Sequence, residues 1–322
     1  MSEKGAVSRT GSEALPLSAD VLVVDRLTAR HGPSACEDVS FSIPPGSIHA
    51  LLGDRGAGKA AVIAAVLGQR KPSSGSVWVS GRDTWRNRRA LSGWVEAVTP
   101  EVGVRGSATL ERLSKRRSRF GETWDEQGLR QRLRRFGVPM DESWKRLTNP
   151  QRTFALLALS LASSPRLVVL HHTGILSAGE GDQPLIGELR GAASAGVSLL
   201  VVTDRPDEVE TIADRVSVLR SGRLVLNGDC ARLKAGFRRI RYRNEISSER
   251  TEYGNELDEF EAVQVRVRGW GVEAVVSNFS DSTYDRFRRI PGVFDVELFT
   301  MSWAEIFEAI GRQQRTNRVP SP

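Results

Sequence analysis

The stretch IHALLGDRGAGKAA, residues 48–61, decides the fold of this chain. Its first five residues are almost all apolar and end at a glycine, which is typical of a strand buried on both faces. Residues 60–67 are rich in alanine and precede Gly68, which predicts a helix. A glycine-rich loop with a lysine between such a strand and such a helix predicts a phosphate site, because backbone N–H groups and the helix N-terminus face the anion.

Within this loop we expect Gly53, Gly56 and Gly58 to form the cradle and Lys59 to reach the terminal phosphates. A glycine-rich turn with a surface lysine is the alternative, and the flanking strand and helix argue against it. Loops of this type continue with Ser or Thr, whose hydroxyl coordinates Mg²⁺. Ala60 and Ala61 stand there instead, so the sequence predicts an anion cradle without its metal ligand.

Composition places the chain among ordinary globular proteins. With 322 residues, 39% hydrophobic and 26% charged, it has room for one large domain and a small one. No apolar run reaches the roughly 18 residues that a membrane helix needs, and the polar N-terminus lacks the core of a signal peptide. Cys36 and Cys230 are too few for a disulfide framework or a metal site. We therefore expect a cytoplasmic chain whose membrane link comes through a partner.

The net charge of +7 comes partly from two basic clusters, residues 115–119 and 238–243. Both lie beside acidic stretches, and neither alternates with aromatic residues in the sequence. We interpret them as solvated faces and expect no nucleic-acid partner.

Strands alternate with helices between residues 21 and 226, which predicts a parallel α/β sheet. The charged, helix-periodic segment 110–136 predicts a helical insertion of about 103–162. After residue 235 the pattern changes to a compact β-β-α-β-α unit. We expect a disordered tail at 1–19, a nucleotide-binding domain at 20–235, a small α+β domain at 236–312 and a flexible tail at 313–322. Within these domains the predicted strands are 21–24, 39–43, 48–52, 167–170, 197–202, 216–219, 224–226, 260–267, 272–276 and 292–298, and the predicted helices are 60–67, 154–162, 184–189, 207–213, 281–290 and 303–310.

Several further stretches carry a family resemblance: residues 27–32, 39–41, 163–167 and 212–224. Together with the phosphate loop they resemble the ATP-binding subunits of ABC transporters. IPGV at 290–293 and SWAEIFEAI at 302–310 look like the small C-terminal domain of the bacterial drug-efflux, daunorubicin-resistance-like type. The resemblance implies a P-loop NTPase fold of the ABC type with a helical subdomain, ATP as cofactor, a membrane-embedded permease as partner, and pairing as a homodimer or heterodimer at the inner face of the membrane.

The positions that would carry chemistry depart from the family. Strand 167–170 should be followed by Asp and Glu, which hold Mg²⁺ and activate water, but His171 and His172 follow it. Asp204 replaces the switch histidine, and His31 stands where an aromatic ring would stack on adenine. The expected glutamine near residues 99–101 is missing. The signature loop, usually Leu-Ser-Gly-Gly-Gln, is Leu147, Thr148, Asn149, Pro150 and Gln151.

These departures predict weak ATP binding and poor or absent hydrolysis, because phosphoryl transfer depends on neutralising charge around the γ-phosphate. Pro150 has no N–H to offer a phosphate, and Asn149 adds bulk where the backbone should approach closely. Imidazole suits Mg²⁺ poorly. A transition metal shared by His171 and His172 is disfavoured, because adjacent residues of a strand point to opposite faces. A protonated His171 that replaces the magnesium charge is a hypothesis that predicts pH-dependent affinity.

Three functions follow from the sequence. The first is a non-hydrolysing ABC subunit of a membrane exporter, with a structural or regulatory role. The second is an active ATPase subunit of an efflux transporter, which leaves enzymatic activity open. The third is an interaction module that has left transport.

Overall fold

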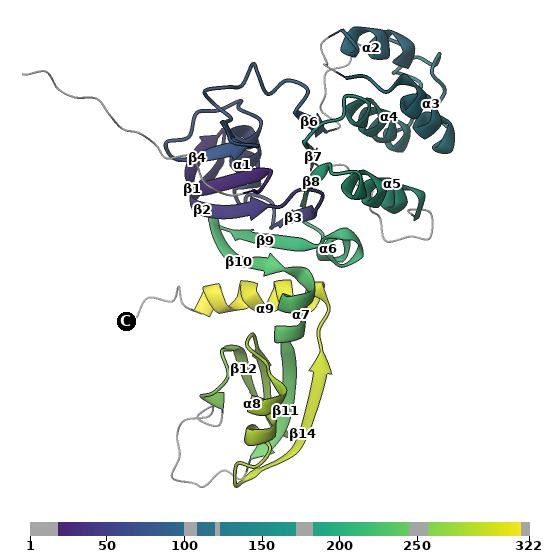
Figure 1. The fold of residues 1–322 in the computed structure, drawn as a ribbon. Coiled ribbons are helices and arrows are strands. Elements are labelled where there is room, and N and C mark those ends of the chain that lie inside the picture. Colours follow the sequence, from purple (N-terminus) through teal and green to yellow (C-terminus); the bar gives the residue numbers. More distant parts are fainter. Residues whose placement is uncertain (1–18, 100–107, 120–122, 172–182, 245–256, 317–322) are drawn as a thin grey trace, which may run out of the picture.

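The computed structural model describes residues 19–99, 108–119, 123–171, 183–244 and 257–316. In these ranges the strands form one six-stranded sheet and two four-stranded sheets (Figure 1). Helices cover both faces of the six-stranded sheet, and none of them is long and apolar enough to cross a membrane in the described part of the chain.

The central sheet has the strand order β10-β9-β3-β8-β7-β6. Its strands run parallel except β10, which pairs antiparallel with β9 at one edge. This confirms the predicted parallel α/β sheet, and β3 and β8 are buried along their whole length, as their apolar sequences require. The strands are β3 (Ile48–Leu52), β6 (Val95–Val98), β7 (Leu167–His171), β8 (Ser198–Thr203), β9 (Arg215–Arg220) and β10 (Arg223–Asp229).

An antiparallel sheet of order β2-β1-β4-β5 lies over one face of the central sheet, with helix α1 (Lys59–Val66) packed between the two. The sequence predicted β1 and β2 as shorter strands, whereas β4 and β5 were not predicted. The strands are β1 (Leu22–His31), β2 (Ser34–Ile43), β4 (Ser74–Val79) and β5 (Arg82–Asp83).

The other face of the central sheet carries the helical part of the chain, of which α2, α3 and α4 stand apart from α1 (Figure 1). Helix α4 begins at Asn149, five residues before the predicted start at Phe154, because Thr148 caps it. The helices are α2 (Leu110–Arg117), α3 (Glu126–Arg135), α4 (Asn149–Leu161), α5 (Gln183–Ser194) and α6 (Pro206–Ile212).

A third sheet, of order β12-β13-β11-β14, follows α7 (Cys230–Gly236) and carries α8 on one face. The sequence missed β11, so the predicted β-β-α-β-α order was incomplete. The basic cluster of residues 238–243 lies on this strand, and its arginines are partly or fully exposed. Ile240 and Tyr242 of this strand are fully buried against α8, while the arginines between them point to the opposite face. The elements are β11 (Arg238–Asn244), β12 (Ala262–Arg268), β13 (Gly271–Val276), α8 (Asp281–Phe287), β14 (Val293–Thr300) and α9 (Trp303–Thr316).

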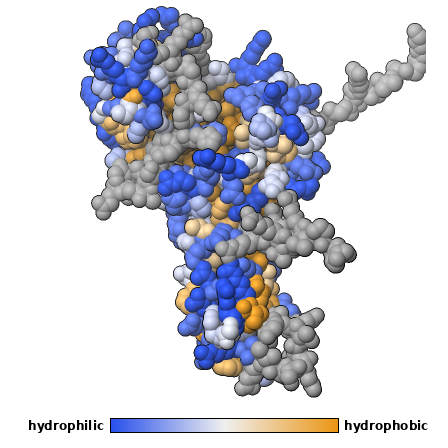
Figure 2. Space-filling view, turned by 180° about the vertical axis from the view of Figure 1, so that it is seen from behind, coloured by the Kyte–Doolittle hydropathy of each residue, from blue (hydrophilic) through white to orange (hydrophobic). Residues whose placement is uncertain are grey.

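The opposite face of this third sheet mixes arginines with aromatic rings. The guanidinium of Arg241 lies 5.1 Å from the ring centroid of Phe299 and 5.7 Å from that of Trp270. These rings come from other parts of the chain, so the sequence around the second basic cluster does not show them. Figure 2 shows apolar surface on this part of the molecule, where the exposed large apolar residues of the described chain gather: Val265, Val267, Trp270, Phe294, Leu298 and Phe299.

Helix α9 joins the third sheet to the central one, since it lies between them in Figure 1. Trp303 and Phe307 of α9 share a buried core with Leu52 of β3 and Val218 of β9. The C-terminal helix thus shares its core with β3, the strand that the phosphate loop follows, and it packs against α6 and β12.

Candidate functional site

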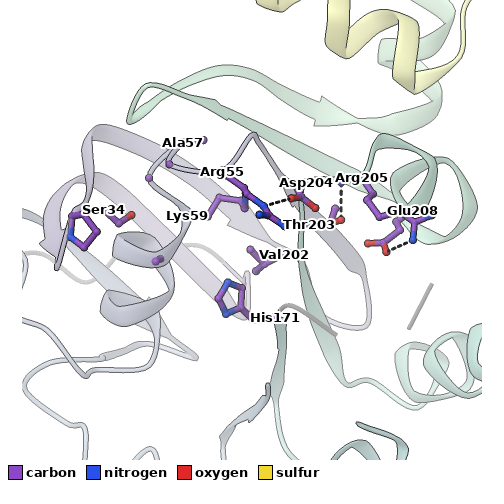
Figure 3. A pocket seen from close by; sticks show the side chains of 14 residues that line it. Ser34, Arg55, Ala57, Lys59, His171, Val202, Thr203, Asp204, Arg205 and Glu208 are labelled. Carbon is purple, nitrogen blue, oxygen red and sulfur yellow. Dashed lines mark hydrogen bonds and ion pairs between the residues drawn. The ribbon is translucent and has the colours of Figure 1, made fainter. Parts of the chain in front are cut away.

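A cavity of about 560 Å³ opens at the carboxyl ends of β3, β7 and β8 (Figure 3). Parallel strands place the loops that follow them at one edge of the sheet, so segments far apart in the sequence meet there. The residues that line the cavity come from the turn between β1 and β2, the phosphate loop and the start of α1, the ends of β7 and β8, and the start of α6: Pro33, Ser34, Arg55, Gly56, Ala57, Gly58, Lys59, Ala60, His171, Val202, Thr203, Asp204, Arg205 and Glu208.

The backbone of the phosphate loop requires glycine at two of the predicted positions. Gly58 has φ +105°, and a Cβ there would lie 2.5 Å from the carbonyl oxygen of Ala35. A Cβ on Gly53 would lie 2.5 Å from the carbonyl oxygen of Leu219. The N-cap residue of α1, Gly58, provides no side-chain cap, while Oγ of Ser34 accepts from the N–H of Ala61 at 3.3 Å. This end of the helix lines the cavity, where its dipole favours an anion.

Lys59 is the buried cation of the site. Its side chain folds back so that Nζ donates to the carbonyl oxygens of Gly53 at 2.5 Å and Asp54 at 3.1 Å. Burial lowers the pKa of Lys59, while the negative charges of Asp204 and Asp54 oppose that shift. The ammonium group lines the cavity beside the loop in which the phosphates of a nucleotide are expected to bind.

Asp204 brings a carboxylate to the cavity at the end of β8. Its Oδ2 lies 3.7 Å from Nε of Arg55, an exposed residue of the phosphate loop (Figure 3). Deeper in the cavity wall, burial raises the pKa of Glu208, and the ion pair with Arg205 at 3.8 Å partly offsets this shift. Charges of both signs thus surround the site, and its two carboxyl groups oppose anion binding.

The two positions at which the resemblance predicts Mg²⁺ ligands carry no side-chain oxygen atom. His171 at the end of β7 and Ala60 at the start of α1 both line the cavity, where the family needs an aspartate and a hydroxyl (Figure 3). An imidazole and a methyl group fit Mg²⁺ badly, because this ion prefers hard oxygen donors. No group of three or more His, Cys, Asp or Glu side chains in the described ranges is placed to hold a metal ion. His172 lies outside the described residues.

The signature stretch, residues 147–151, forms the start of α4 and does not line this cavity. Thr148 is the N-cap: its Oγ1 accepts from the N–H of Gln151 at 3.4 Å, and Oε1 of Gln151 accepts from the N–H of Thr148 at 3.0 Å. Pro150 has no N–H and lies in the first turn, where proline is well accommodated. The helix start is well capped, and few donors remain there for a phosphate.

The structure brings together most of the predicted positions but not all of them. Gly56, Gly58, Lys59, Ala60, His171 and Asp204 line one cavity, whereas Gly53 and Ala61 lie just behind its lining. His31 ends β1 and does not line the cavity, because the chain turns there and presents its neighbours Pro33 and Ser34.

Eight of the lining residues were not predicted from the sequence: Pro33, Ser34, Arg55, Ala57, Val202, Thr203, Arg205 and Glu208. A signal was present for some of them, since Arg55 and Ala57 lie within the loop and Thr203 directly follows a predicted strand.

Comparison with known proteins agrees with this geometry. The sequence profile of the ABC transporter family matches residues 36–171. The ribose import ATP-binding protein RbsA 2 of Rubrobacter xylanophilus is 31% identical over 208 residues, which is 60% of this chain and 40% of that protein. The arabinose import ATP-binding protein AraG 2 of Burkholderia ambifaria is 30% identical over 232 residues, 67% of this chain and 44% of that protein. The chain thus spans less than half the length of these curated relatives.

Solved structures show the same fold. The structure of an ATP-binding subunit of an ABC transporter superimposes with a TM-score of 0.59 at 19% identity, covering 67% of this chain and 92% of that one. A nucleotide-free ATP-binding cassette gives a TM-score of 0.55 at 16% identity, covering 65% and 91%. With its cavity at the carboxyl ends of the parallel strands and its glycine-lysine loop, this chain has the P-loop fold of an ABC ATP-binding cassette, and its residues 36–171 match the ABC transporter family.

Proposed function

We propose that this chain is an ATP-binding subunit of an ABC transporter that binds ATP weakly and hydrolyses it poorly or not at all. One observation carries the proposal: Lys59, Gly56 and Gly58 line the same cavity as Ala60 and His171. The anion cradle is therefore present, whereas the oxygen ligands for Mg²⁺ are replaced.

Several losses act together against hydrolysis. A bound Mg²⁺ neutralises the charge that develops around the γ-phosphate, and a positioned base aligns the attacking water. Each of these contributions is worth orders of magnitude in rate, so their joint loss leaves little catalysis. ATP binding depends less on the metal, because backbone N–H groups and a lysine hold phosphate by themselves.

Pairing would not repair the site. In the family, each nucleotide lies between the phosphate loop of one subunit and the signature loop of the other. This chain is altered at both, since Pro150 and the capped start of α4 replace the donors of the signature loop. A homodimer or a heterodimer containing this chain would thus have weakened composite sites, which favours a structural or regulatory role beside a membrane permease.

The direction of transport has two candidates. The resemblance of residues 290–293 and 302–310 to the drug-efflux type favours export, and we keep an exporter of that type as the first candidate. The relatives named above are ribose and arabinose import ATP-binding proteins, and this favours import as the second. Co-purification from the native host, with identification of the membrane protein that accompanies the chain, distinguishes the two. The same experiment tests the third hypothesis, because an interaction module outside transport would bring no permease.

Titration with ATP, with and without Mg²⁺, tests binding and hydrolysis. We expect Lys59→Ala to weaken ATP binding by about 10- to 100-fold, since hydrogen bonds to charged groups contribute about 1.5–3 kcal/mol. Lys71→Ala removes an exposed lysine beyond α1 and is the matched control, which should bind like the unmodified chain. Rapid Mg²⁺-dependent ATP turnover that disappears in Lys59→Ala would contradict the proposal and establish an active ATPase.

A further inference from the structure

Arg220, the last residue of β9, joins the phosphate loop to the C-terminal helix. Its side chain is 15% exposed, and its Nη1 donates to Oδ2 of Asp54 at 2.8 Å. Its Nη2 donates to the carbonyl oxygen of Phe307 in α9 at 2.6 Å, and its guanidinium lies 4.1 Å from the centroid of the Phe307 ring. A single side chain thus contacts the second residue of the loop and the middle of α9.

Helix α9 is shaped to receive this arginine. A Cβ on Gly311 would lie 2.7 Å from three atoms of the Arg220 guanidinium, so any other residue there would displace this group. The turn after Arg220 also supports the loop, because the N–H of Gly222 donates to the carbonyl oxygen of Ala57 at 3.0 Å. The end of β9 is therefore a brace between the loop and the helix.

The other end of α9 is tied to the third sheet. Glu305 forms an ion pair with Arg239 of β11, and its Oε2 accepts from the N–H of Ser302 at 2.8 Å. A continuous series of contacts therefore runs from β11 through α9 and Arg220 to Asp54.

The charge of Asp54 gives this series a consequence for ligand binding. A carboxylate within an anion-binding loop repels phosphate, and the charge of Asp54 already acts on Lys59. Arg220 neutralises this carboxylate and fixes its position. If α9 moved away, Arg220 would lose its contacts with Phe307. It would then hold Asp54 less firmly, and the phosphate loop would become less ordered.

We propose that Arg220 is a positioning residue that couples the docking of α9, and with it the third sheet, to anion binding at the phosphate loop. The inference rests on the function proposed above, since it assumes that ATP binds at this loop. A shift of the third sheet, caused by a partner or by a second subunit, would change ATP affinity through this side chain.

The first test compares variants by ATP titration without Mg²⁺. Arg220→Met keeps the length of the side chain and removes its charge and hydrogen bonds, and we expect about three- to tenfold weaker binding. Gly311→Ala displaces the guanidinium without changing the loop and should weaken binding about two- to threefold. Gly187→Ala in α5 is the matched control, because a Cβ there meets no atom within 4 Å and the gain in helix propensity is the same.

The second test repeats Gly311→Ala and Arg220→Met in a chain that carries Asp54→Asn. If the coupling passes through the Arg220–Asp54 ion pair, both substitutions should lose most of their effect in this background, so the double-mutant cycles are non-additive. A purely structural role of Arg220 predicts additive losses. Wild-type affinity in Arg220→Met and Gly311→Ala, or additive cycles, would overturn the proposal.

Hydrogen exchange of residues 53–59 without nucleotide separates this inference from the proposed function. We expect faster exchange in Arg220→Met and in Gly311→Ala, but not in Gly187→Ala, while the thermal unfolding midpoint stays above the assay temperature. If the unmodified chain binds no ATP, the proposed function fails, yet faster exchange in these variants still supports the coupling. Unchanged exchange in Arg220→Met and Gly311→Ala overturns the coupling, whatever the affinity for ATP.

Discussion

Ala60 and His171 both line the cavity, one at the start of α1 and the other at the end of β7. The missing hydroxyl and carboxylate are thus two local losses in a cavity whose backbone framework is kept. A local loss of this kind is reversible by substitution, because the loop that would hold the metal-bound phosphates does not depend on either side chain.

We therefore predict that Ala60→Ser combined with His171→Asp makes ATP binding dependent on Mg²⁺. The two substitutions supply the hydroxyl and carboxylate oxygens that this ion prefers, and we expect about tenfold tighter ATP binding with Mg²⁺ than without it. The unmodified chain should bind ATP with nearly the same affinity in both conditions. Calorimetric titration measures this difference, and the absence of a magnesium effect in the double variant would show that more than these two ligands is missing.

His49 shows how a buried titratable residue limits stability in acid. It is fully buried, it stacks on Phe41 with ring centroids 5.2 Å apart, and its Nε2 lies 2.8 Å from Oγ of Ser217. Burial, together with the charge of Arg215, lowers the pKa of His49 from 6.5 to about 3. The folded chain therefore keeps this imidazole neutral in a range where the unfolded chain protonates it.

The sign of the pH effect follows from this difference. Above pH 6.5 His49 is mostly neutral in both the folded and the unfolded chain, so it has little effect on the free energy of unfolding. Between pH 6.5 and 3 the unfolded chain binds an extra proton at His49, and the free energy of unfolding falls as the pH falls. At pH 5 we expect a loss of about 2 kcal/mol from this residue relative to pH 7. Urea unfolding at both pH values measures it, and His49→Gln, which does not titrate, should show a smaller loss by that amount. An equal pH dependence in both chains would disprove this assignment.

At the scale of elements, the start of α4 is specified by its cap. Thr148 and Gln151 satisfy each other's backbone N–H groups, and Pro150 fits the first helical turn. We predict that Thr148→Ala lowers the free energy of unfolding by about 1 kcal/mol, because an N-cap hydroxyl contributes about 0.5–2 kcal/mol. Thr148→Ser keeps the hydroxyl and is the matched control, expected to be near neutral. The urea unfolding midpoints of the two variants measure this difference. Equal midpoints would show that the Thr148 hydroxyl does not stabilise the start of α4.

The elements also show what the sequence could and could not predict. The buried strand, the glycine loop and the helix of residues 48–67 were predicted because apolar runs and glycines act locally. Strand β11 was missed because its arginines dominate the composition, although Ile240 and Tyr242 alternate with them in the period of a strand. The position of His31 was misjudged because a turn at Gly32 decides which side chains face the cavity.

The site was predictable where strand ends define it. Lys59, His171 and Asp204 follow three strands of one parallel sheet, so their convergence follows from topology. The ion pairs Arg55–Asp204 and Arg220–Asp54 join residues about 150 or more positions apart, and nothing local in the sequence pairs them. The packing of α9 against the rest of the molecule depends on side-chain contacts between distant residues, so it could not be predicted from the sequence either.

At the scale of the whole molecule, one buried core contains residues from both sides of the predicted boundary at residue 235. Trp303 and Phe307 of α9 share one core with Leu52 and Val218, which belong to the central sheet. Cores that share side chains unfold together, because exposing one half removes the apolar contacts of the other. We infer that the expected domain at 236–312 does not act as an independently stable unit.

Trp303→Ala tests this inference, since the side chain is 2% exposed and lies in that shared core. We predict a loss of about 3–5 kcal/mol in the free energy of unfolding, as for other buried large-to-small substitutions. The loss should appear in both sheets, as equally faster hydrogen exchange in β9 and in β11 and as a single urea transition by circular dichroism. Trp270→Ala removes a tryptophan that is 44% exposed on the third sheet, and this control should change stability by less than about 0.5 kcal/mol. If Trp303→Ala accelerates exchange in β11 while β9 keeps its protection, the third sheet is a separate folding unit, and the coupling through Arg220 would then have to operate across a domain boundary.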